Sequence, residues 1–150
     1  MQHNYRTQAV AQQIHEHCLG VRVGRLHRLI ARRFEQALRP AGLSGSQLEV
    51  LTALTIHGGA VKPSQLADWL GAERSTVSRN LALMQDKGLV AAAACSASGR
   101  SMSVVITDSG TQTLRRAGSA WRAEQDALTE LLGPDAAATL DTWLGQLTSS

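Results

Sequence analysis

The sequence has few of the features that mark membrane, secreted or disulfide-stabilised proteins. It contains two cysteines, Cys18 and Cys95, which are too few and too far apart to form a disulfide framework. No apolar run approaches the roughly 20 residues that a helix needs to cross a bilayer. Residues 1–10 lack the apolar core of a signal peptide. We therefore expect a cytoplasmic protein that does not contact a membrane.

Motifs of the common enzyme classes are also missing. The sequence has no G-x-S-x-G, P-loop, H-E-x-x-H or paired C-x-x-C motif. We therefore expect no catalytic activity and no cofactor. The chain shows no internal repeat, and its 150 residues with 43% hydrophobic content correspond to one domain, 1–150. A net charge of +3 and a pI near 9.4 fit a polyanionic partner but do not identify one.

The most informative stretch is 63–88, which predicts two short helices joined by a tight turn. The first helix, 63–70, begins with a proline, which suits the first helical turn. Gly71 follows it, and glycine is the usual residue where a helix ends in a left-handed conformation. The second helix spans about 73–87 and stops at Gly88. Two helices across a glycine-containing turn are typical of the helix-turn-helix motif.

The second predicted helix has two different faces. Val77, Leu81 and Met84 are spaced by four and three residues and form one apolar stripe. The opposite face carries hydroxyl, amide and guanidinium groups, which are the types that contact base edges and phosphates. Capping or packing is the alternative role for Ser75 and Thr76. The candidates for DNA contact are Arg74, Ser75, Thr76, Ser78 and Arg79.

A β-hairpin is predicted directly after this helix. Residues 89–95 are apolar, 96–99 are turn-like and 101–107 alternate in polarity. A hairpin in this position is a wing, and Arg100 at its tip is predicted to enter the minor groove of DNA. The alternation places Met102, Val104 and Ile106 on one face and Ser101 and Ser103 on the other.

With these elements the sequence resembles the MarR family of bacterial transcriptional regulators from about residue 18 to residue 147. The resemblance rests on the order of the elements and on five short segments. These segments are 66–67 (LA), 75–79 (STVSR), 87–90 (KGLV), 99–100 (GR) and 106–110 (ITDSG). One position departs from the family pattern, because Ser98 stands where family wings usually carry an aspartate.

The resemblance implies a mainly α fold with a small β-hairpin wing. In that fold, 43–107 form the DNA-binding core, and 1–42 and 108–150 form dimerisation helices. It also implies a repressor that binds a palindromic operator as a homodimer and is released by a small aromatic or phenolic ligand. The apolar stripes of the helices at both chain ends also favour a two-fold dimer, because a single winged helix offers too little surface to bury them.

The flanking segments give further expectations. A long amphipathic helix is predicted from about Thr7 to Leu38, with a break or bend near Gly20 and Gly24. Ser44 and Gln47 have the spacing of a capping box, and Thr107 is a candidate cap for a helix that ends at 133–134. A last helix is expected over about 134–147. Trp121 and Trp143 are interpreted as core residues, with stacking on a ligand as the alternative. His27 and His57 are interpreted as structural.

Cys18 is the remaining candidate site residue. Packing in a dimer interface is one interpretation. The other is a redox sensor, because the hydroperoxide-sensing branch of the family keeps a reactive cysteine near this place. His15, His17 or Arg22 would favour the reactive thiolate, but the supporting tyrosines of that branch are missing. We expect no metal site here, because a closed site needs a fourth ligand besides His15, His17 and Cys18.

A winged helix used only for protein contacts is the rival hypothesis. Such a surface would expose more apolar area than residues 74–80 and Arg100 provide. The two hypotheses differ in whether the protein binds DNA in a salt-dependent way.

Overall fold

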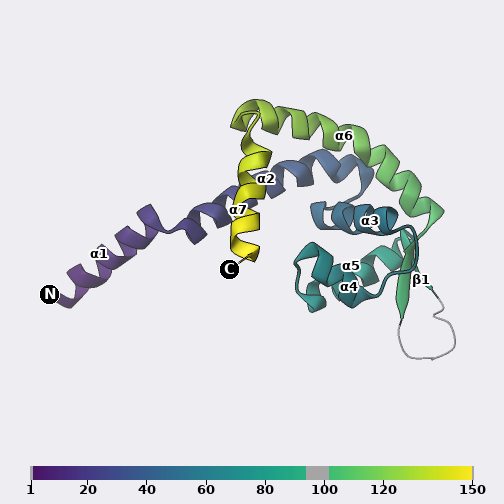
Figure 1. Cartoon of the computed structure of the whole chain (residues 1–150), viewed down its shortest axis with the longest axis horizontal. Helices are drawn as coiled ribbons and strands as arrows, with labels where there is room; N and C mark the ends of the chain where they lie inside the picture. Colours follow the sequence, from purple (N-terminus) through teal and green to yellow (C-terminus); the bar gives the residue numbers. More distant parts are fainter. Residues whose placement is uncertain (1, 94–101, 150) are drawn as a thin grey trace.

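The computed structural model describes residues 2–93 and 102–149, and these form helices and one two-stranded hairpin (Figure 1). The elements are α1 (Gln2–His17), α2 (Leu19–Leu38), the 3₁₀ helix η1 (Arg39–Ala41), α3 (Gly45–His57), α4 (Pro63–Leu70), α5 (Arg74–Asp86), β1 (Val90–Ala93), β2 (Ser103–Ile106), α6 (Asp108–Leu132) and α7 (Ala136–Thr148).

The described elements form an arch above a compact lobe (Figure 1). Helices α2 and α6 lie side by side and make the arch. The lobe contains α3, α4, α5 and the hairpin, and α3 lies nearest the arch. Helix α1 extends away from the lobe, and α7 turns back from the end of α6 across α2. This is a winged helix-turn-helix core flanked by N- and C-terminal helices, which confirms the predicted fold class.

The hydrophobic core lies in the lobe and under one end of the arch. Leu51 and Leu54 of α3, Leu66 of α4 and Met84 of α5 are completely buried, together with Leu38 at the end of α2. Burial of each such side chain contributes about 1.5–3 kcal/mol of transfer free energy. These contacts fix α4 and α5 against α3, which lies behind them as the sequence predicted.

The expected break in the N-terminal helix is found at Cys18. This residue adopts an extended conformation, with φ −70° and ψ 116°, between α1 and α2. The break lies two residues before Gly20, whereas Gly24 is inside the continuous helix α2. Helix α1 also begins earlier than Thr7, at Gln2.

Two predicted caps are present. The Ser44 side chain accepts a hydrogen bond from the Gln47 backbone, and the Gln47 side chain accepts one from the Ser44 backbone. These reciprocal bonds form the expected capping box at the start of α3. Thr107 caps α6, since its Oγ1 accepts a hydrogen bond of 3.0 Å from the Gly110 N–H.

The hairpin is antiparallel and pairs Val90 with Ile106. Its far strand differs from the predicted alternation, because Met102 precedes β2 and is 68% exposed, whereas Ser103 and Val104 are both buried. A third segment, which the sequence pattern did not reveal, also pairs with this strand. Val61 exchanges two backbone hydrogen bonds with Val104, of 2.9 and 2.8 Å, so that β2 is covered on both edges.

Candidate nucleic-acid interface and neighbouring cavities

A left-handed glycine sets the angle between α4 and α5. Gly71 has φ +58°, and the Ala72 N–H that follows donates to the Ala67 carbonyl. An L-residue with a side chain rarely adopts this conformation. The chain therefore turns sharply, and the apolar stripe of α5 faces the interior of the lobe. Its residues Val77, Leu81 and Met84 are at most 4% exposed.

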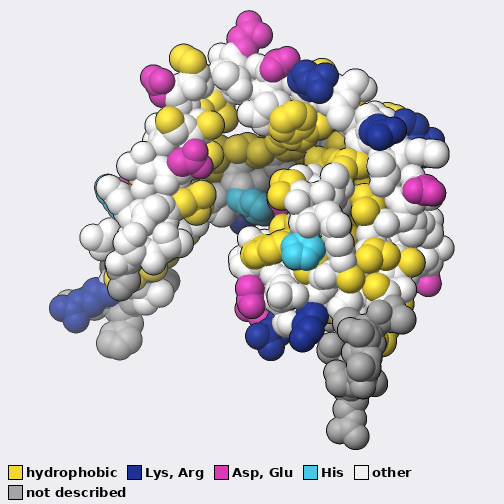
Figure 2. All heavy atoms as spheres, turned by 45° about the vertical axis from the view of Figure 1, so that its right-hand side comes forward, with side chains coloured by type: hydrophobic (Ala, Val, Ile, Leu, Met, Phe, Trp, Pro, Cys, Tyr) yellow, Lys and Arg dark blue, Asp and Glu magenta, His cyan; other side chains and the backbone are white. Residues whose placement is uncertain are grey.

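The opposite face of α5 is open to solvent. The five predicted DNA-contact residues are Arg74, Ser75, Thr76, Ser78 and Arg79, and all of them are exposed. Glu73 occupies the N-cap position, so Ser75 is not the helix cap. Arg79 makes one long hydrogen bond within the helix, 3.4 Å from its Nε to the Ser75 carbonyl, which leaves most of its guanidinium group available. Figure 2 shows Lys and Arg side chains at the lower end of this lobe.

The predicted wing arginine, Arg100, lies outside the described residues, and so does Cys95. The base of the wing is described, and it follows α5 directly. The Leu89 N–H donates to the Met84 carbonyl, and Thr107 Oγ1 donates to the Gly88 carbonyl at 2.7 Å. These bonds hold both strands of the hairpin to the end of α5.

Two polar contacts position α5, and the site prediction did not include them. Asn80 Nδ2 donates to Ser46 Oγ at 3.0 Å, which connects α5 to the first turn of α3. Lys87 Nζ donates to the Gly42 carbonyl at 3.1 Å and to Gln47 Oε1 at 3.3 Å. The polar character of Asn80 was visible in the sequence, but its partner, which lies 34 positions earlier, was not.

The first turn of α3 also contacts the arch. Glu35 Oε1 of α2 accepts a hydrogen bond of 3.1 Å from the Gly45 N–H. Ser44 Oγ and Ser46 Oγ are 3.1 Å apart in the same turn. Hydrogen bonds on both sides of the first turn of α3, which we call the Glu35–Asn80 relay, therefore join an arch helix to α5.

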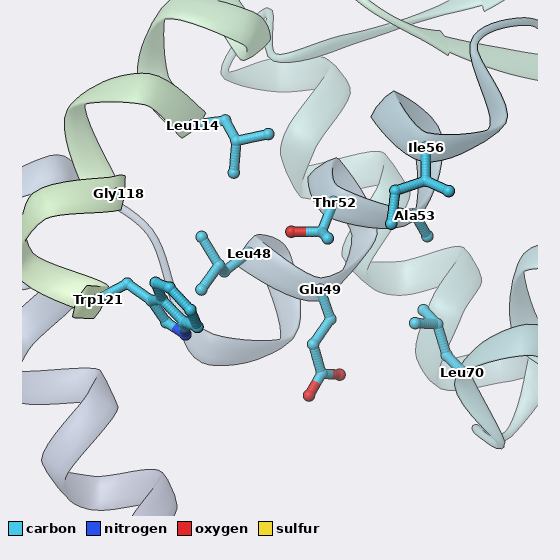
Figure 3. A pocket seen from close by; sticks show the side chains of 9 residues that line it. All are labelled: Leu48, Glu49, Thr52, Ala53, Ile56, Leu70, Leu114, Gly118 and Trp121. Atoms are coloured by element: carbon cyan, nitrogen blue, oxygen red, sulfur yellow. The ribbon is translucent and has the colours of Figure 1, made fainter. Parts of the chain in front are cut away.

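A cavity of about 500 Å³ lies between α3, α4 and the middle of α6. We call it the α3–α6 cavity, and Figure 3 shows the side chains around it. They are almost entirely apolar, and Glu49 supplies the ionisable group. Trp121 was predicted to be a core residue, but its side chain is 40% exposed and lines this cavity. The lining residues are Leu48, Glu49, Thr52, Ala53, Ile56, Leu70, Leu114, Gly118 and Trp121.

A second cavity of about 440 Å³ lies on the α2 side of the same residues, and we call it the α2–α3 cavity. It shares Leu48, Glu49 and Trp121 with the first cavity. Glu35, Gly45 and Ser46 of the relay also line it, with His27 and the apolar side of α2. A molecule bound here would touch the relay directly.

Cys18 is a partly buried free thiol at the junction of α1 and α2. The predicted neighbouring cations are bonded elsewhere: the Arg22 guanidinium donates to the Glu16 carbonyl, and His17 Nδ1 is 3.3 Å from the Gln13 carbonyl. Within 2–93 and 102–149, no cluster of three or more His, Cys, Asp or Glu side chains could hold a metal ion. His57 lies beside Trp69, with ring centroids 5.2 Å apart.

Large apolar side chains are exposed on the helices outside the lobe. Leu19 and Val23 of α2 are 75% and 55% exposed. On α7, Trp143, Leu144 and Leu147 are 50–76% exposed, so Trp143 is not a core residue in the single chain. Among the helices described, none combines the length and the apolar character that crossing a bilayer requires.

Comparison with known proteins agrees with this geometry. A MarR family model matches residues 41–101, which include the helix-turn-helix and the start of the wing. The solved structure of the M. tuberculosis transcriptional regulator MosR is 30% identical, with a TM-score of 0.77 over 90% of this chain and 98% of that chain. A search of curated proteins by sequence finds no significant match.

Two further structures extend the comparison. The transcriptional repressor CouR, bound to a 23-mer DNA duplex, is 27% identical to this chain with a TM-score of 0.77. The match covers 91% of this chain and 95% of the CouR chain. A mutant MarR from E. coli complexed with operator DNA is 20% identical with a TM-score of 0.79, over 90% of this chain and 96% of that chain, which supports the fold alone. The matched family model, the fold and the identity to MosR over nearly its whole length lead to one assignment: this chain belongs to the MarR family of transcriptional regulators.

Proposed function

We propose that this regulator binds duplex DNA through α5 and represses transcription from a palindromic operator. The observation that carries the proposal is the division of α5 into two faces. Its apolar stripe is buried in the lobe, while Arg74, Ser75, Thr76, Ser78 and Arg79 are exposed together. Hydroxyl and guanidinium groups on an exposed helix suit the major groove. MosR and CouR, which are similar over nearly the whole chain, have both been solved with DNA.

The proposed active species is a homodimer formed by α1, α2 and α7. The exposed apolar side chains of α2 and α7 support this, because they form surfaces that a single chain leaves in contact with water. A two-fold dimer would bury the same patch on both subunits. It would also present two α5 helices to DNA, about one helical turn apart, which matches a palindromic site.

Release from DNA is proposed to follow binding of a small aromatic molecule in the cavities beside Trp121. CouR has also been solved with p-coumaroyl-CoA. Here, the α2–α3 cavity is lined by Glu35, Gly45 and Ser46, and Ser46 accepts the hydrogen bond from Asn80 of α5. A ligand that binds more tightly when these bonds are rearranged would shift the population toward a dimer with misplaced α5 helices.

A thiol sensor at Cys18 is the second candidate. The observation that favours it is that Cys18 carries a free thiol that is only partly buried. The residue also lies at the break between α1 and α2, where oxidation would alter the path of the chain.

A DNA-binding titration tests both candidates. Fluorescence anisotropy with labelled duplexes from the region beside the gene should show saturable binding. The affinity should fall steeply between about 50 and 200 mM salt, because each phosphate contact releases a counterion from the DNA. Absence of binding at low salt would contradict the proposal. Loss of binding after one equivalent of organic hydroperoxide, resisted by Cys18→Ser, would select the thiol sensor. Unchanged DNA binding after the hydroperoxide treatment would contradict the thiol sensor and favour release by a small molecule.

A further inference from the structure

We infer that the α3–α6 cavity selects an aromatic cation, such as an arylalkylamine, over an aromatic carboxylate. The inference rests on the proposed function, because it names the class of ligand that would release the regulator from DNA. It depends on the charged side chains that line the two cavities. These are few, because most of the residues that line the α3–α6 cavity are apolar.

The charged groups that line the cavities are mainly acidic. Glu49 lines both cavities, and Glu35 lines the α2–α3 cavity. His27 is the remaining ionisable group of the second cavity. Within the part of the chain that the structure describes, no Lys or Arg lines either space. A carboxylate ligand would therefore find no guanidinium or ammonium partner, which is the usual means of binding such a group.

The Glu49 charge is also not neutralised within the chain. Among the described residues, the ion pair that the structure contains joins Arg33 of α2 to Glu124 of α6. Glu49 takes no part in it and is exposed on α3. Its carboxylate keeps contact with water, so it can attract a cation without the large desolvation cost of a buried charge.

The aromatic part of the ligand has a matching surface. Figure 3 shows the Trp121 indole extending from α6 beside Leu48, with the Glu49 side chain leaving α3 between Trp121 and Leu70 in this view. An indole face attracts cations through its quadrupole, and tryptophan is the best of the aromatic residues for this contact. The apolar walls accept a ring, while Trp121 and Glu49 both favour positive charge at its end.

The size of the preference follows from the exposure of Glu49. A partly exposed ion pair favours binding by up to about fivefold. Repulsion disfavours an anion by a similar factor. We therefore expect an amine to bind up to about fivefold more tightly than an uncharged analogue, and the analogue up to about fivefold more tightly than the carboxylate.

Three probes of one shape measure this preference. They are 2-(aminomethyl)naphthalene, 2-naphthalenemethanol and 2-naphthoate, which are cationic, neutral and anionic at pH 7. Isothermal titration calorimetry on the full chain should give affinities in that order. Equal or tighter binding of 2-naphthoate than of the amine would overturn the inference, and so would failure of all three to bind.

Variants locate the preference at the cavity. Glu49→Gln should reduce the amine-to-alcohol ratio to below about twofold and leave the alcohol unchanged. Glu130→Gln, a matched change at an exposed position of α6 outside both cavities, should leave the ratio intact. Trp121→Leu should weaken all three probes. A ratio that survives Glu49→Gln would refute the role of this carboxylate.

The DNA-binding titration separates this inference from the proposed function. If the protein binds DNA and the amine binds but does not release it, the charge preference stands and the induction mechanism fails. If the protein binds DNA while 2-naphthoate is the tighter ligand, the repressor proposal stands and the charge preference fails. If no DNA is bound at low salt, the repressor proposal fails whatever the order of the three probes.

Discussion

Replacement of Gly110 by alanine should strongly destabilise the protein, because this position leaves no room for a methyl group. Gly110 lies in the first turn of α6, where it is buried. A Cβ built on it would be 2.1 Å from the Leu89 carbonyl oxygen and 2.9 Å from Ile106 Cγ1. The carbonyl oxygen is held in place, since the Thr107 N–H donates to it at 3.1 Å and the Thr107 hydroxyl, whose shorter hydrogen bond goes to Gly88, shares its proton with it at 3.1 Å.

The magnitude follows from the movement that alanine would require. To reach an ordinary contact distance, the start of α6 must shift by about 1 Å from the Leu89 carbonyl, and cores resist such overpacking by about 1–3 kcal/mol. The shift also strains the Thr107 cap, whose loss costs about 1 kcal/mol. The higher helix propensity of alanine offsets up to about 1 kcal/mol of this cost, so we expect Gly110→Ala to lower the free energy of unfolding by about 1–3 kcal/mol. At about 2–4 °C per kcal/mol for a chain of this size, the Tm falls by about 2–12 °C.

Circular dichroism during thermal and urea unfolding measures this effect. All samples need the same protein concentration, because the proposed dimerisation would make the Tm concentration-dependent. Gly118→Ala is the matched control: Gly118 lies in the same helix, and an added Cβ would meet nothing within 4 Å. It should stabilise the protein by up to about 1 kcal/mol. A Gly110→Ala protein as stable as the parent would refute the argument from the Leu89 carbonyl.

Further predictions concern the cap, the core and the DNA-contact surface. Thr107→Val removes the side-chain hydrogen bonds at the start of α6 and should destabilise the fold by about 1–2 kcal/mol in urea unfolding, whereas unchanged stability would show that the cap is dispensable. Met84→Ala empties a completely buried site and should cost about 2–5 kcal/mol by the same assay; a smaller loss would mean that the lobe collapses around the space. Arg79→Ala should weaken DNA binding and lower the salt-dependence slope by about 0.9, while Arg122→Ala, an exposed arginine of α6, should leave both unchanged. Arg100→Ala should reduce affinity across many sequences in the anisotropy titration, and equal affinity would exclude the predicted minor-groove contact.

Local signals in the sequence were sufficient for the helix ends and for the two faces of α5. The capping box at Ser44 and Gln47 and the cap at Thr107 were predicted because a cap connects residues only three positions apart. The stripe of Val77, Leu81 and Met84 was predicted because a helix repeats every 3.6 residues. Both depend on short-range geometry, which the order of residues fixes.

Capping patterns and helical periodicity do not predict contacts between segments that are far apart in the sequence. Met102 is predicted to share a face with Val104 and Ile106, yet Met102 is exposed while Val104 is buried and pairs with Val61 from a distant part of the chain. Trp121 was assigned to the core, yet the spacing of α3 and α6 leaves it beside a cavity.

The sequence by itself therefore determined the helices, their caps and the chemical character of the α5 surface. The tertiary structure decided that Asn80 bonds to Ser46, that Gly110 lies against Leu89, and that Glu49 and Trp121 line the same cavity. The physical reason is that periodicity and capping act within a few residues along one helix. Cavities, steric limits and hydrogen bonds between elements depend on how whole helices pack, and packing is decided by the summed burial of side chains far apart in the chain.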